Sequence, residues 1–411
     1  MPSADASAGR PARLGVYVDT RYARRDGAVL ADPIDASFLL FVLAVAHRFD
    51  GVLLLGRVGP PEADAAGLVA LPGNPAIAPL PHYADLRSLG AVARASLGTL
   101  RAFRRALDDV DIVWVFGPHP FAFALLALAR LRGKRVALGV RQDSIGYARS
   151  RLPGRAWLPL LGVVQLLDLG FRLLARRVPA TVVGEAIAER YGGGPTVLPM
   201  TVSVIRAADV VDAPAAKRWD GTLELLTVGR LEPEKNPLLL LEALARLERR
   251  RPGRYRLTWV GAGRLRDDVA RRADALGLGD AVALPGHVPF GPELLARYRE
   301  AHLFVHVSLT EGVPQVLLEA LAAGTAVVGT DVGGVAAALD GGAAGILVPP
   351  EDVDALVVAV ERLSDDVALR ERLVARGLEL ARARTLEAES ARVAAHLGAP
   401  TRTAPREADP R

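Results

Sequence analysis

The sequence has no cysteine and little lysine, and both shortages narrow the function classes open to it. Without cysteine, the chain cannot form disulfides, use a thiolate nucleophile or bind metal through sulfur. Only three residues are lysine, Lys134, Lys217 and Lys235, so the formal net charge of +5 comes almost entirely from arginine. Aromatic residues make up only 5% of the chain and are not interleaved with basic residues, and no helix-turn-helix pattern or zinc-ligand spacing is present. These absences argue against a nucleic-acid partner.

The remaining composition is that of a folded protein. Hydrophobic residues make up 51% of the chain and charged residues 24%, which supplies large cores and excludes wholesale disorder. A length of 411 residues is long for one core and suits two domains of roughly 200 residues each. Both ends, residues 1–11 and 398–411, are predicted to be disordered tails. The first lacks the apolar run of a signal peptide, so we expect a cytoplasmic protein.

Short apolar runs alternate with helical patterns almost throughout the chain. In the first half the strand-like runs are 14–19, 51–56, 111–116, 134–140 and 180–184, with helical patterns at 35–48, 88–107 and 119–131. In the second half the strand-like runs are 223–229, 255–261, 281–284, 303–308, 325–330 and 345–348. Strands that are apolar throughout are buried on both faces, as in parallel sheets. The pattern predicts an α/β fold with two doubly wound, Rossmann-like parallel-sheet domains and a ligand in the cleft between them.

Breaks in the alternation predict the domain boundaries. The first domain covers 12–199, a linker with little periodicity covers 200–221, and the second domain covers 222–375. Residues 376–397 read as C-terminal helices that could pack back on the first domain. The proline-rich stretch 57–84 has little periodicity and is predicted to be an unusually long loop.

The segment VGRLEPEKNP, residues 228–237, places two cations directly after a strand. Asn236 and Pro237 then open a helix as its N-cap and first-turn residues. Arg230 and Lys235 beside a helix N-terminus would make a diphosphate site. The alternative is that both are ordinary solvated surface charges.

A second strand is followed by glycines, in WVGAGRLRDD, residues 259–268. Gly261 and Gly263 would allow close backbone approach, as at a nucleotide site. Arg266 stands where a dinucleotide-binding fingerprint has its third glycine, so that fingerprint is absent. The alternative interpretation of the two glycines is a tight turn.

The segment TEGVPQVLLEALAAG, residues 310–324, places two carboxylates around a short apolar helix. Pro314 is predicted at the first helical position, so that Gly312 and Val313 direct free N–H groups toward a ligand. Glu311 would lie at the mouth of the site, and carboxylates pair well with sugar hydroxyls. The neighbours of Glu319 are apolar, so its carboxylate should be mostly buried and needs a partner.

Taken together, these motifs resemble a known family. The runs GRLEPEKNPLLLLEALARL, WVGAGRLRDDV and LPGHVPFGPELLARYREAHLFVHVSLTEGVPQVLLEALAAGTAVVGTDVGGVAAAL look like the donor-binding half of retaining glycosyltransferases of family 4, which have the GT-B fold. The resemblance covers residues 229–339 in the family's order and spacing. It implies that the second domain binds a nucleotide-sugar, UDP- or GDP-linked, and that the first domain faces the acceptor.

The resemblance also implies roles for single residues. Arg230 and Lys235 match the basic pair that holds the donor diphosphate and stabilises the leaving group. Glu319 matches the glutamate that binds the ribose hydroxyls, and Glu311 matches the one at the donor sugar. Main-chain contacts to the donor would come from the remaining members of the motifs, namely Gly229, Gly261, Gly263, Gly312, Val313 and Pro314.

The chemistry implied by the resemblance needs no further group. The family generally uses neither a bound metal nor a cofactor, so we expect none here. Retention of the anomeric configuration is usually assigned to same-face attack assisted by the leaving phosphate, and no protein nucleophile is expected.

The first domain departs from the family pattern. Members often have a glycine-rich turn after the first strand, whereas VDTRYARRDGA, residues 18–28, contains only Gly27, so Asp26 and Gly27 are the acceptor-side candidates there. Members also commonly have a histidine late in the strand 111–116, where this chain has none. His119, at a helix start, is the candidate substitute. The alternative is a histidine that points into solvent.

Two further segments of the first domain bear on the acceptor. Arg141, Gln142 and Asp143 follow the strand 134–140 and are acceptor-side candidates. Residues 157–177 form an apolar helical stretch with a basic end and one polar stripe. Such a helix could lie on an anionic membrane at the inner face of the cell and bring the enzyme to a lipid-linked acceptor. The pattern favours a core helix packed against the first sheet.

Three functions remain at this point. The leading hypothesis is a retaining, metal-independent glycosyltransferase that moves a sugar from a nucleotide-sugar to a glycan or lipid-linked acceptor. The second is a non-catalytic nucleotide-sugar or carbohydrate-binding protein of the same fold. The third is an epimerase or phosphorylase of this fold; a phosphorylase would need a pyridoxal lysine, for which three lysines leave few candidates.

Overall fold

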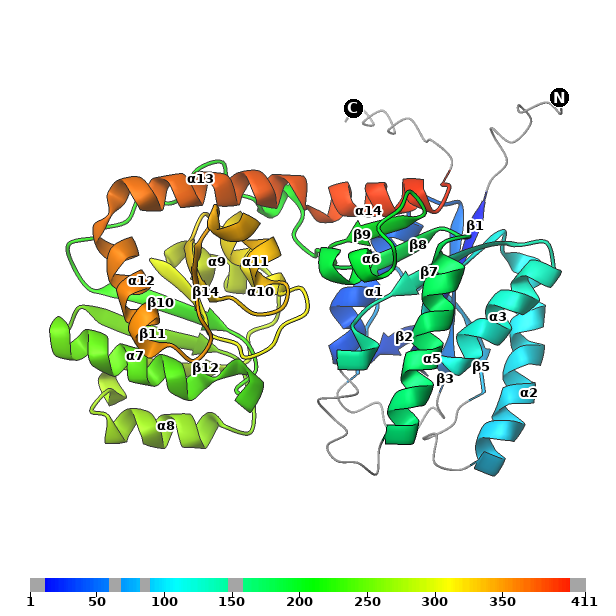
Figure 1. Cartoon of the computed structure of the whole chain (residues 1–411), viewed down its shortest axis with the longest axis horizontal. Coiled ribbons are helices and arrows are strands. Elements are labelled where there is room, and N and C mark those ends of the chain that lie inside the picture. Colours follow the sequence, from blue (N-terminus) through cyan, green and yellow to red (C-terminus); the bar gives the residue numbers. More distant parts are fainter. Residues whose placement is uncertain (1–11, 59–67, 82–88, 147–157, 400–411) are drawn as a thin grey trace. The chain divides into compact units, whose positions relative to one another are not determined.

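The computed structural model describes residues 12–58, 68–81, 89–146 and 158–399. The chain divides into two compact units (Figure 1): unit 1 is Met1–Val204 with Glu387–Arg411, and unit 2 is Ile205–Leu386. Each unit contains a largely parallel sheet flanked by helices. The predicted α/β fold with two doubly wound sheets is confirmed. The predicted tails lie outside the described residues, apart from 398 and 399.

Unit 1 contains a 9-stranded sheet. Its strands are β1 (Arg13–Arg25), β2 (Ala28–Ala31), β3 (Gly51–Val58), β4 (Val69–Ala70), β5 (Ala76–Leu80), β6 (Ile112–Gly117), β7 (Arg135–Val140), β8 (Ala180–Val183) and β9 (Val197–Met200). Its helices are α1 (Pro33–Ala46), α2 (Leu89–Ala106), α3 (Pro120–Leu131), α5 (Leu158–Ala175), α6 (Glu185–Arg190) and α14 (Leu386–His396), whose first residue belongs to unit 2. The parallel strands run in the order β5-β3-β1-β6-β7-β8-β9, so the winding reverses between β1 and β6.

Strand β1 is longer than the sequence pattern predicts. Its first part pairs with β6, and residues 22–25 form an antiparallel hairpin with β2. The turn is Asp26-Gly27, with φ angles of 51° and 78°, and an Asp-Gly pair is a strong signal for such a hairpin. The strand expected to end at residue 19 therefore continues to Arg25 and is followed by a tight turn.

The predicted long loop 57–84 is also partly wrong. It contains β4, which pairs with β2, and β5, which pairs with β3 at the edge of the sheet. The proline content concealed β5, because an edge strand tolerates a proline such as Pro79. Residues 59–67 and 82–88 of this stretch lie outside the described residues.

Unit 2 contains a 6-stranded parallel sheet in the order β12-β11-β10-β13-β14-β15. The strands are β10 (Leu223–Val228), β11 (Tyr255–Val260), β12 (Val282–Gly286), β13 (Leu303–His306), β14 (Ala326–Thr330) and β15 (Ile346–Val348). The helices are α7 (Pro237–Arg250), α8 (Arg266–Ala275), α9 (Pro292–Glu300), α10 (Gln315–Ala322), α11 (Val335–Ala338), α12 (Val353–Asp365) and α13 (Val367–Ala383). The winding reverses between β10 and β13, and this is where open α/β sheets bind their ligands.

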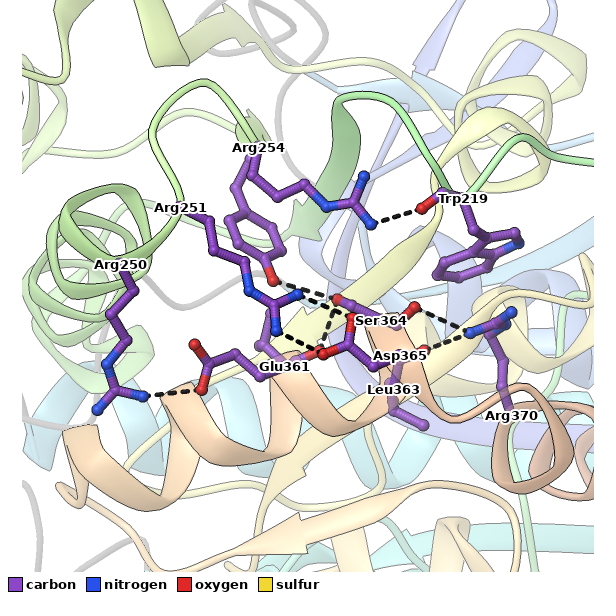
Figure 2. Close-up of polar contacts among 11 residues, drawn as sticks. Trp219, Arg250, Arg251, Arg254, Glu361, Leu363, Ser364, Asp365 and Arg370 are labelled. Carbon is purple, nitrogen blue, oxygen red and sulfur yellow. Dashed lines mark hydrogen bonds and ion pairs between the residues drawn. The ribbon is translucent and has the colours of Figure 1, made fainter.

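The predicted linker 200–221 largely belongs to unit 2. The Val211 N–H donates to the Ala322 carbonyl over 3.0 Å. Arg254 donates to the Trp219 carbonyl, and the Arg370 guanidinium lies 3.5 Å from the centroid of the Trp219 ring (Figure 2). Single anchors of this kind leave no periodicity in the sequence, and this is why the segment looked like a linker.

The last three helices divide differently from the prediction. The expected boundary at residue 375 falls inside α13, which is continuous to Ala383 and packs on unit 2 where Gly377 meets the Leu321 side chain. Ion pairs also bind α12 to the end of α7: Arg251 makes two contacts of 2.8 and 2.6 Å with Asp365 (Figure 2). Only α14 joins unit 1, where Glu389 accepts a hydrogen bond from the Thr201 N–H.

Candidate functional site at the β10 and β13 edge

Two predicted site residues from different motifs meet at the reversal point of the unit 2 sheet. The loop after β10 places Lys235 beside Glu311, which lies on the loop after β13, and the two form an ion pair. The Leu309 N–H donates to the Glu234 carbonyl over 2.8 Å and joins the same two loops through the backbone. The side-chain pair therefore lies on a supported edge of the sheet.

The carboxylate of Glu311 receives three polar side chains on one oxygen. Lys235 Nζ donates to Oε1, Ser308 Oγ donates to it over 2.6 Å, and His306 Nε2 lies 3.0 Å away. Burial by itself raises the pKa of Glu311, but contact with His306 and the charge of Lys235 outweigh it and lower the pKa to about 2. Glu311 is thus a carboxylate throughout the physiological pH range.

His306 and Ser308 were missed by the sequence analysis. Both are buried, His306 as the last residue of β13 and Ser308 two positions later. A signal was present, since LFVHVS places two polar residues on the same side of a strand that is otherwise apolar. Sequence alone gave no partner for them, because their contact with Glu311 depends on how the exit loop folds back.

The second predicted cation, Arg230, is more exposed than Lys235. Its side chain is 67% exposed and pairs with Glu234, four residues along the chain, over 2.7 Å. Another cation on this edge, Arg264, was not predicted and pairs with Glu232 over 3.0 Å. Exposed pairs of this kind are weak, so both guanidinium groups can turn toward an anion.

The glycines of the site allow loops to pack closely. A Cβ atom on Gly261 would lie 1.9 Å from the Gly229 carbonyl oxygen, and one on Gly263 would lie 2.3 Å from the Leu231 carbonyl oxygen. These two predicted donor-binding glycines have a structural role of their own, since they seat the loop after β11 on the loop after β10. Their approach to a donor remains a prediction.

Two glycines that were not predicted, Gly333 and Gly334, allow the same close packing against the loop that contains Glu311. A Cβ atom on Gly333 would lie 1.9 Å from the Glu311 carbonyl oxygen, and one on Gly334 would lie 2.1 Å from that of Gly312. The loop after β14 therefore fixes the backbone around the first carboxylate. Two adjacent glycines in TDVGG were the available signal.

Of the two predicted helix starts, the one at Asn236 and Pro237 is confirmed and the one at Pro314 is shifted by one residue. Asn236 is the N-cap of α7 and Pro237 its first residue, but the Asn236 side chain makes no capping hydrogen bond. Asn236 instead adopts the left-handed conformation, with φ of 48°, which asparagine tolerates better than most residues. Pro314 precedes α10 as its N-cap, and the helix begins at Gln315, one residue later than predicted.

Glu319 has the partner that its apolar surroundings required. Only 5% of it is exposed, and its Oε2 accepts a hydrogen bond of 2.7 Å from the Tyr298 hydroxyl on α9. Burial raises the pKa of Glu319 to about 7, although the hydrogen bond from Tyr298 acts in the opposite direction. Burial likewise raises the pKa of Tyr298, so the hydroxyl stays a donor.

Unit 1 has a polar cluster at its own reversal point, between β1 and β6. Asp19 Oδ1 lies 2.9 Å from Arg57 Nε, and Asp19 Oδ2 lies 3.2 Å from His119 Nε2. His119 is the N-cap of α3, and its Nδ1 accepts a hydrogen bond from the Phe121 N–H. Burial lowers the pKa of His119, with Asp19 opposing and Arg57 assisting. His119 therefore does not point into solvent, which was the alternative considered from sequence.

The other acceptor-side candidates do not converge. Arg141 donates to Asp35 over 2.7 Å, and Asp143 accepts from Arg190 over 2.9 Å, which lowers the pKa of Asp143. Asp26 lies at the hairpin tip with 95% of its side chain exposed. The hydrogen bonds of Arg141 and Asp143 lead to Asp35 and Arg190, and not to the hairpin tip.

A family model matches the part of the chain that contains this site, and curated relatives match about half of the chain or more. The model described as "Glycosyl transferases group 1" matches residues 213–379. A glycogen synthase of Mycobacterium tuberculosis is 37% identical over 196 residues, 46% of this chain and 45% of that protein. A D-inositol 3-phosphate glycosyltransferase of Frankia alni is 33% identical over 270 residues, 62% of each chain. The chain thus spans about half to three fifths of the length of these relatives.

Solved structures resemble almost the whole chain. Sucrose-phosphate synthase from Thermosynechococcus elongatus has a TM-score of 0.66 at 18% identity and covers 93% of this chain and 97% of its own. The Anabaena protein HepE, solved with UDP and glucose, has a TM-score of 0.64 at 16% identity and covers 94% and 99%. At such low identity the likeness shows the fold, which is the GT-B architecture of two Rossmann-like units.

Proposed function

We propose that this chain is a glycosyltransferase that moves a sugar, with retention of anomeric configuration, from a UDP- or GDP-linked donor to a hydroxyl of a glycan or lipid-linked acceptor. One observation carries the proposal: Lys235 and Glu311, from separate motifs, form an ion pair at the reversal point of the unit 2 sheet. That pair lies within the segment matched by the family model.

The cations of this edge suit a nucleoside diphosphate. Lys235 is held in place by Glu311, while Arg230 is exposed and can swing onto the ligand. Breaking the donor's sugar–phosphate bond leaves negative charge on the departing diphosphate, and fixed positive groups stabilise that charge more than they stabilise the donor. We therefore assign leaving-group stabilisation to Arg230 and Lys235, with neither a bound metal nor a cofactor.

The two glutamates suit hydroxyl groups. Glu311 is ionised and accepts hydrogen bonds, so a donor-sugar hydroxyl can replace Lys235 or Ser308 as one of its partners. Glu319 uses Oε2 for Tyr298, and we assign Oε1 to the ribose. Main-chain contacts from Gly229, Gly312 and Val313 complete the proposed donor site.

In the proposed step one bond forms, one bond breaks and one proton is transferred. The acceptor oxygen bonds to the anomeric carbon on the face from which the phosphate oxygen leaves, and the acceptor proton passes to that departing oxygen. No protein side chain takes the role of nucleophile. On the acceptor side we assign Asp19, Arg57 and His119, because they occupy the corresponding edge of unit 1.

The test is to incubate the full chain with UDP- and GDP-sugars, with and without candidate glycan or glycolipid acceptors. Released nucleoside diphosphate and the product anomer would be measured, the latter by NMR. Release that Lys235→Ala suppresses, together with a product of the donor's anomeric configuration, is the expected result.

A binding protein of the same fold would give a different outcome. It would bind a nucleoside diphosphate, lose that binding in Glu319→Ala, and show no release of diphosphate with any donor or acceptor. A product whose anomeric configuration is opposite to that of the donor would contradict the same-face step. It would not contradict the proposed donor site.

A further inference from the structure

Helix α5 of unit 1 presents an apolar face to the outside. Its exposed large side chains are Val163, Leu166, Leu169 and Leu173, with exposed fractions of 50%, 69%, 45% and 50%. They are three or four residues apart, so they lie along one side of the helix. A helix packed as an ordinary core element would turn this side inward.

The opposite side of α5 shows why the helix is oriented this way. Phe171 and Ala175 are buried in the unit 1 core, and Asp168 is buried with them, only 1% exposed. Asp168 accepts a hydrogen bond of 2.9 Å from the Tyr191 hydroxyl and pairs with Arg172 over 3.0 Å. Turning Asp168 outward would break its hydrogen bond with Tyr191, which lies outside α5, so the apolar side is held outward.

Positively charged residues lie at the C-terminal end of the exposed apolar face of α5. Arg176 and Arg177 follow the helix directly and are exposed. Helix α3 packs beside α5 through the Phe123 and Phe171 rings, 5.0 Å apart (Figure 1). Its own C-terminal end contributes exposed Arg130 and Leu131, the latter 83% exposed. The only acidic residue between 158 and 177 is the buried Asp168.

We propose that α5 docks unit 1 on an anionic lipid surface. Its four exposed apolar residues would enter the headgroup region, and Arg176, Arg177 and Arg130 would meet the lipid phosphates. Among the described residues no helix is long and apolar enough to cross a membrane, so the contact would be lateral. The expected core helix is confirmed on one side only: Phe171 and Ala175 pack in the core, whereas of the polar stripe Asp168 is buried and Gln165 is exposed. The inference is independent of which sugar, if any, unit 2 binds.

The test is sedimentation of the full-length protein with sucrose-loaded vesicles, either pure phosphatidylcholine or phosphatidylcholine mixed with phosphatidylglycerol. We expect binding to the anionic vesicles and little to the neutral ones, with loss at high salt. The double variant Leu166→Glu with Leu173→Glu should weaken binding at least about tenfold. Replacing both Arg176 and Arg177 by glutamine should weaken it roughly 25-fold, about fivefold per charge.

Matched controls are available on unit 2. Val358 and Val367 are 56% and 53% exposed, so changing both to glutamate adds the same charge to an exposed apolar pair elsewhere. Arg249 and Arg256 are exposed and serve as the control pair for the arginines. Circular dichroism of each variant confirms folding, and binding by both control proteins should equal that of the wild type.

Three outcomes would overturn the proposal. The first is a wild-type protein that does not sediment with anionic vesicles. The second is sedimentation that the α5 variants and the unit 2 controls reduce equally. The third is a change from dimer to monomer in the α5 variants with unchanged vesicle binding, which would make this face a contact between two copies of the chain. A folded variant that keeps transfer to a soluble acceptor but loses vesicle binding separates docking from catalysis.

Discussion

The two units place similar polar clusters at the same point of similar sheets. In unit 2 a carboxylate, Glu311, lies between Lys235 and His306; in unit 1 a carboxylate, Asp19, lies between Arg57 and His119. Both clusters occur where the winding reverses: Glu311 follows the end of β13, and Asp19 lies in β1 just beyond its parallel pairing with β6. The topology of the fold, more than sequence similarity, sets this position.

The clusters differ in how firmly their central carboxylate is held. The Glu311 side chain is 10% exposed and has a serine as a third partner, and its pKa lies near 2. The Asp19 side chain is 26% exposed. This difference agrees with the proposed roles, in which the more buried cluster of unit 2 binds the donor and the more open cluster of unit 1 binds the acceptor.

The largest expected effect is in the unit 2 cluster. Lys235→Ala should lower kcat for transfer about 10²- to 10³-fold and change the donor KM less, because it removes a cation that acts on the departing phosphate. Glu311 would also lose the charge that lowers its pKa, so the acid limb of the pH–kcat profile should move to higher pH. Arg249→Ala, an exposed cation on the same unit, is the control. A kcat within twofold of wild type would remove Lys235 from the leaving-group role.

A second effect concerns the stability of unit 2. The pKa of Glu319 is about 7 in the folded protein and 4.5 in a model peptide. Between these values the folded state binds a proton that the unfolded state lacks, so stability falls as pH rises through this window, by on the order of 3 kcal/mol. Glu311 acts in the opposite sense, stabilising above pH 4.5 and losing that contribution as pH falls toward 2.

Glu319→Gln should remove the loss of stability between pH 4.5 and 7. The measurement is the urea midpoint of wild type and variant at pH 5 and pH 8. From pH 5 to pH 8 the urea midpoint of the wild type should fall, and it should fall by more than the midpoint of the variant. Equal pH dependence in the two proteins would mean that Glu319 is not buried as a high-pKa carboxyl.

Several of these residues were visible in the sequence, but their contacts were not. The strands buried on both faces, such as β6, were predicted because they are apolar throughout. Arg230, Lys235 and Glu311 were identified because they follow strand ends, and Glu319 because its helical neighbours are apolar. The family resemblance implied their roles. The pairing of Lys235 with Glu311 did not follow, since it joins positions 76 residues apart through two loops.

Unit 1 was harder to predict for physical reasons. The strand β5 contains Pro79, which an edge strand tolerates but a pattern search penalises. Arg57 is the seventh residue of β3 and Asp19 the seventh of β1, where a charged residue suggests a loop unless its partner is known. The outward face of α5 was misjudged because Asp168, a charged residue, turned out to be the buried one.

A smaller effect is expected in the unit 1 cluster. His119→Ala should lower transfer about tenfold, the loss of roughly one hydrogen bond of 1 kcal/mol or slightly more, and leave the affinity for nucleoside diphosphate unchanged. The measurement is steady-state kinetics together with calorimetric binding of the diphosphate. Affinity that falls as much as transfer would show that His119 belongs to the donor site and would break the proposed division between the units.

The smallest effect is expected at the β1–β2 hairpin. Asp26→Asn keeps a residue that tolerates the positive φ of 51° and removes an exposed charge. Transfer should stay within about twofold of wild type in the same assay. A tenfold loss would place the hairpin tip at the acceptor, as the sequence suggested, and would extend the unit 1 site beyond the Asp19 cluster.

We expect unit 2 to bind a nucleoside diphosphate at the edge formed by β10 and β13. Calorimetric titration of UDP and of GDP into wild type, Glu319→Ala and the control Arg249→Ala tests it most directly. One diphosphate should bind the wild type and the control equally, and should bind Glu319→Ala about 10- to 100-fold more weakly because hydrogen bonds to the carboxyl group are lost. Equal affinity in all three proteins would contradict the ribose assignment and the placement of the donor at this edge.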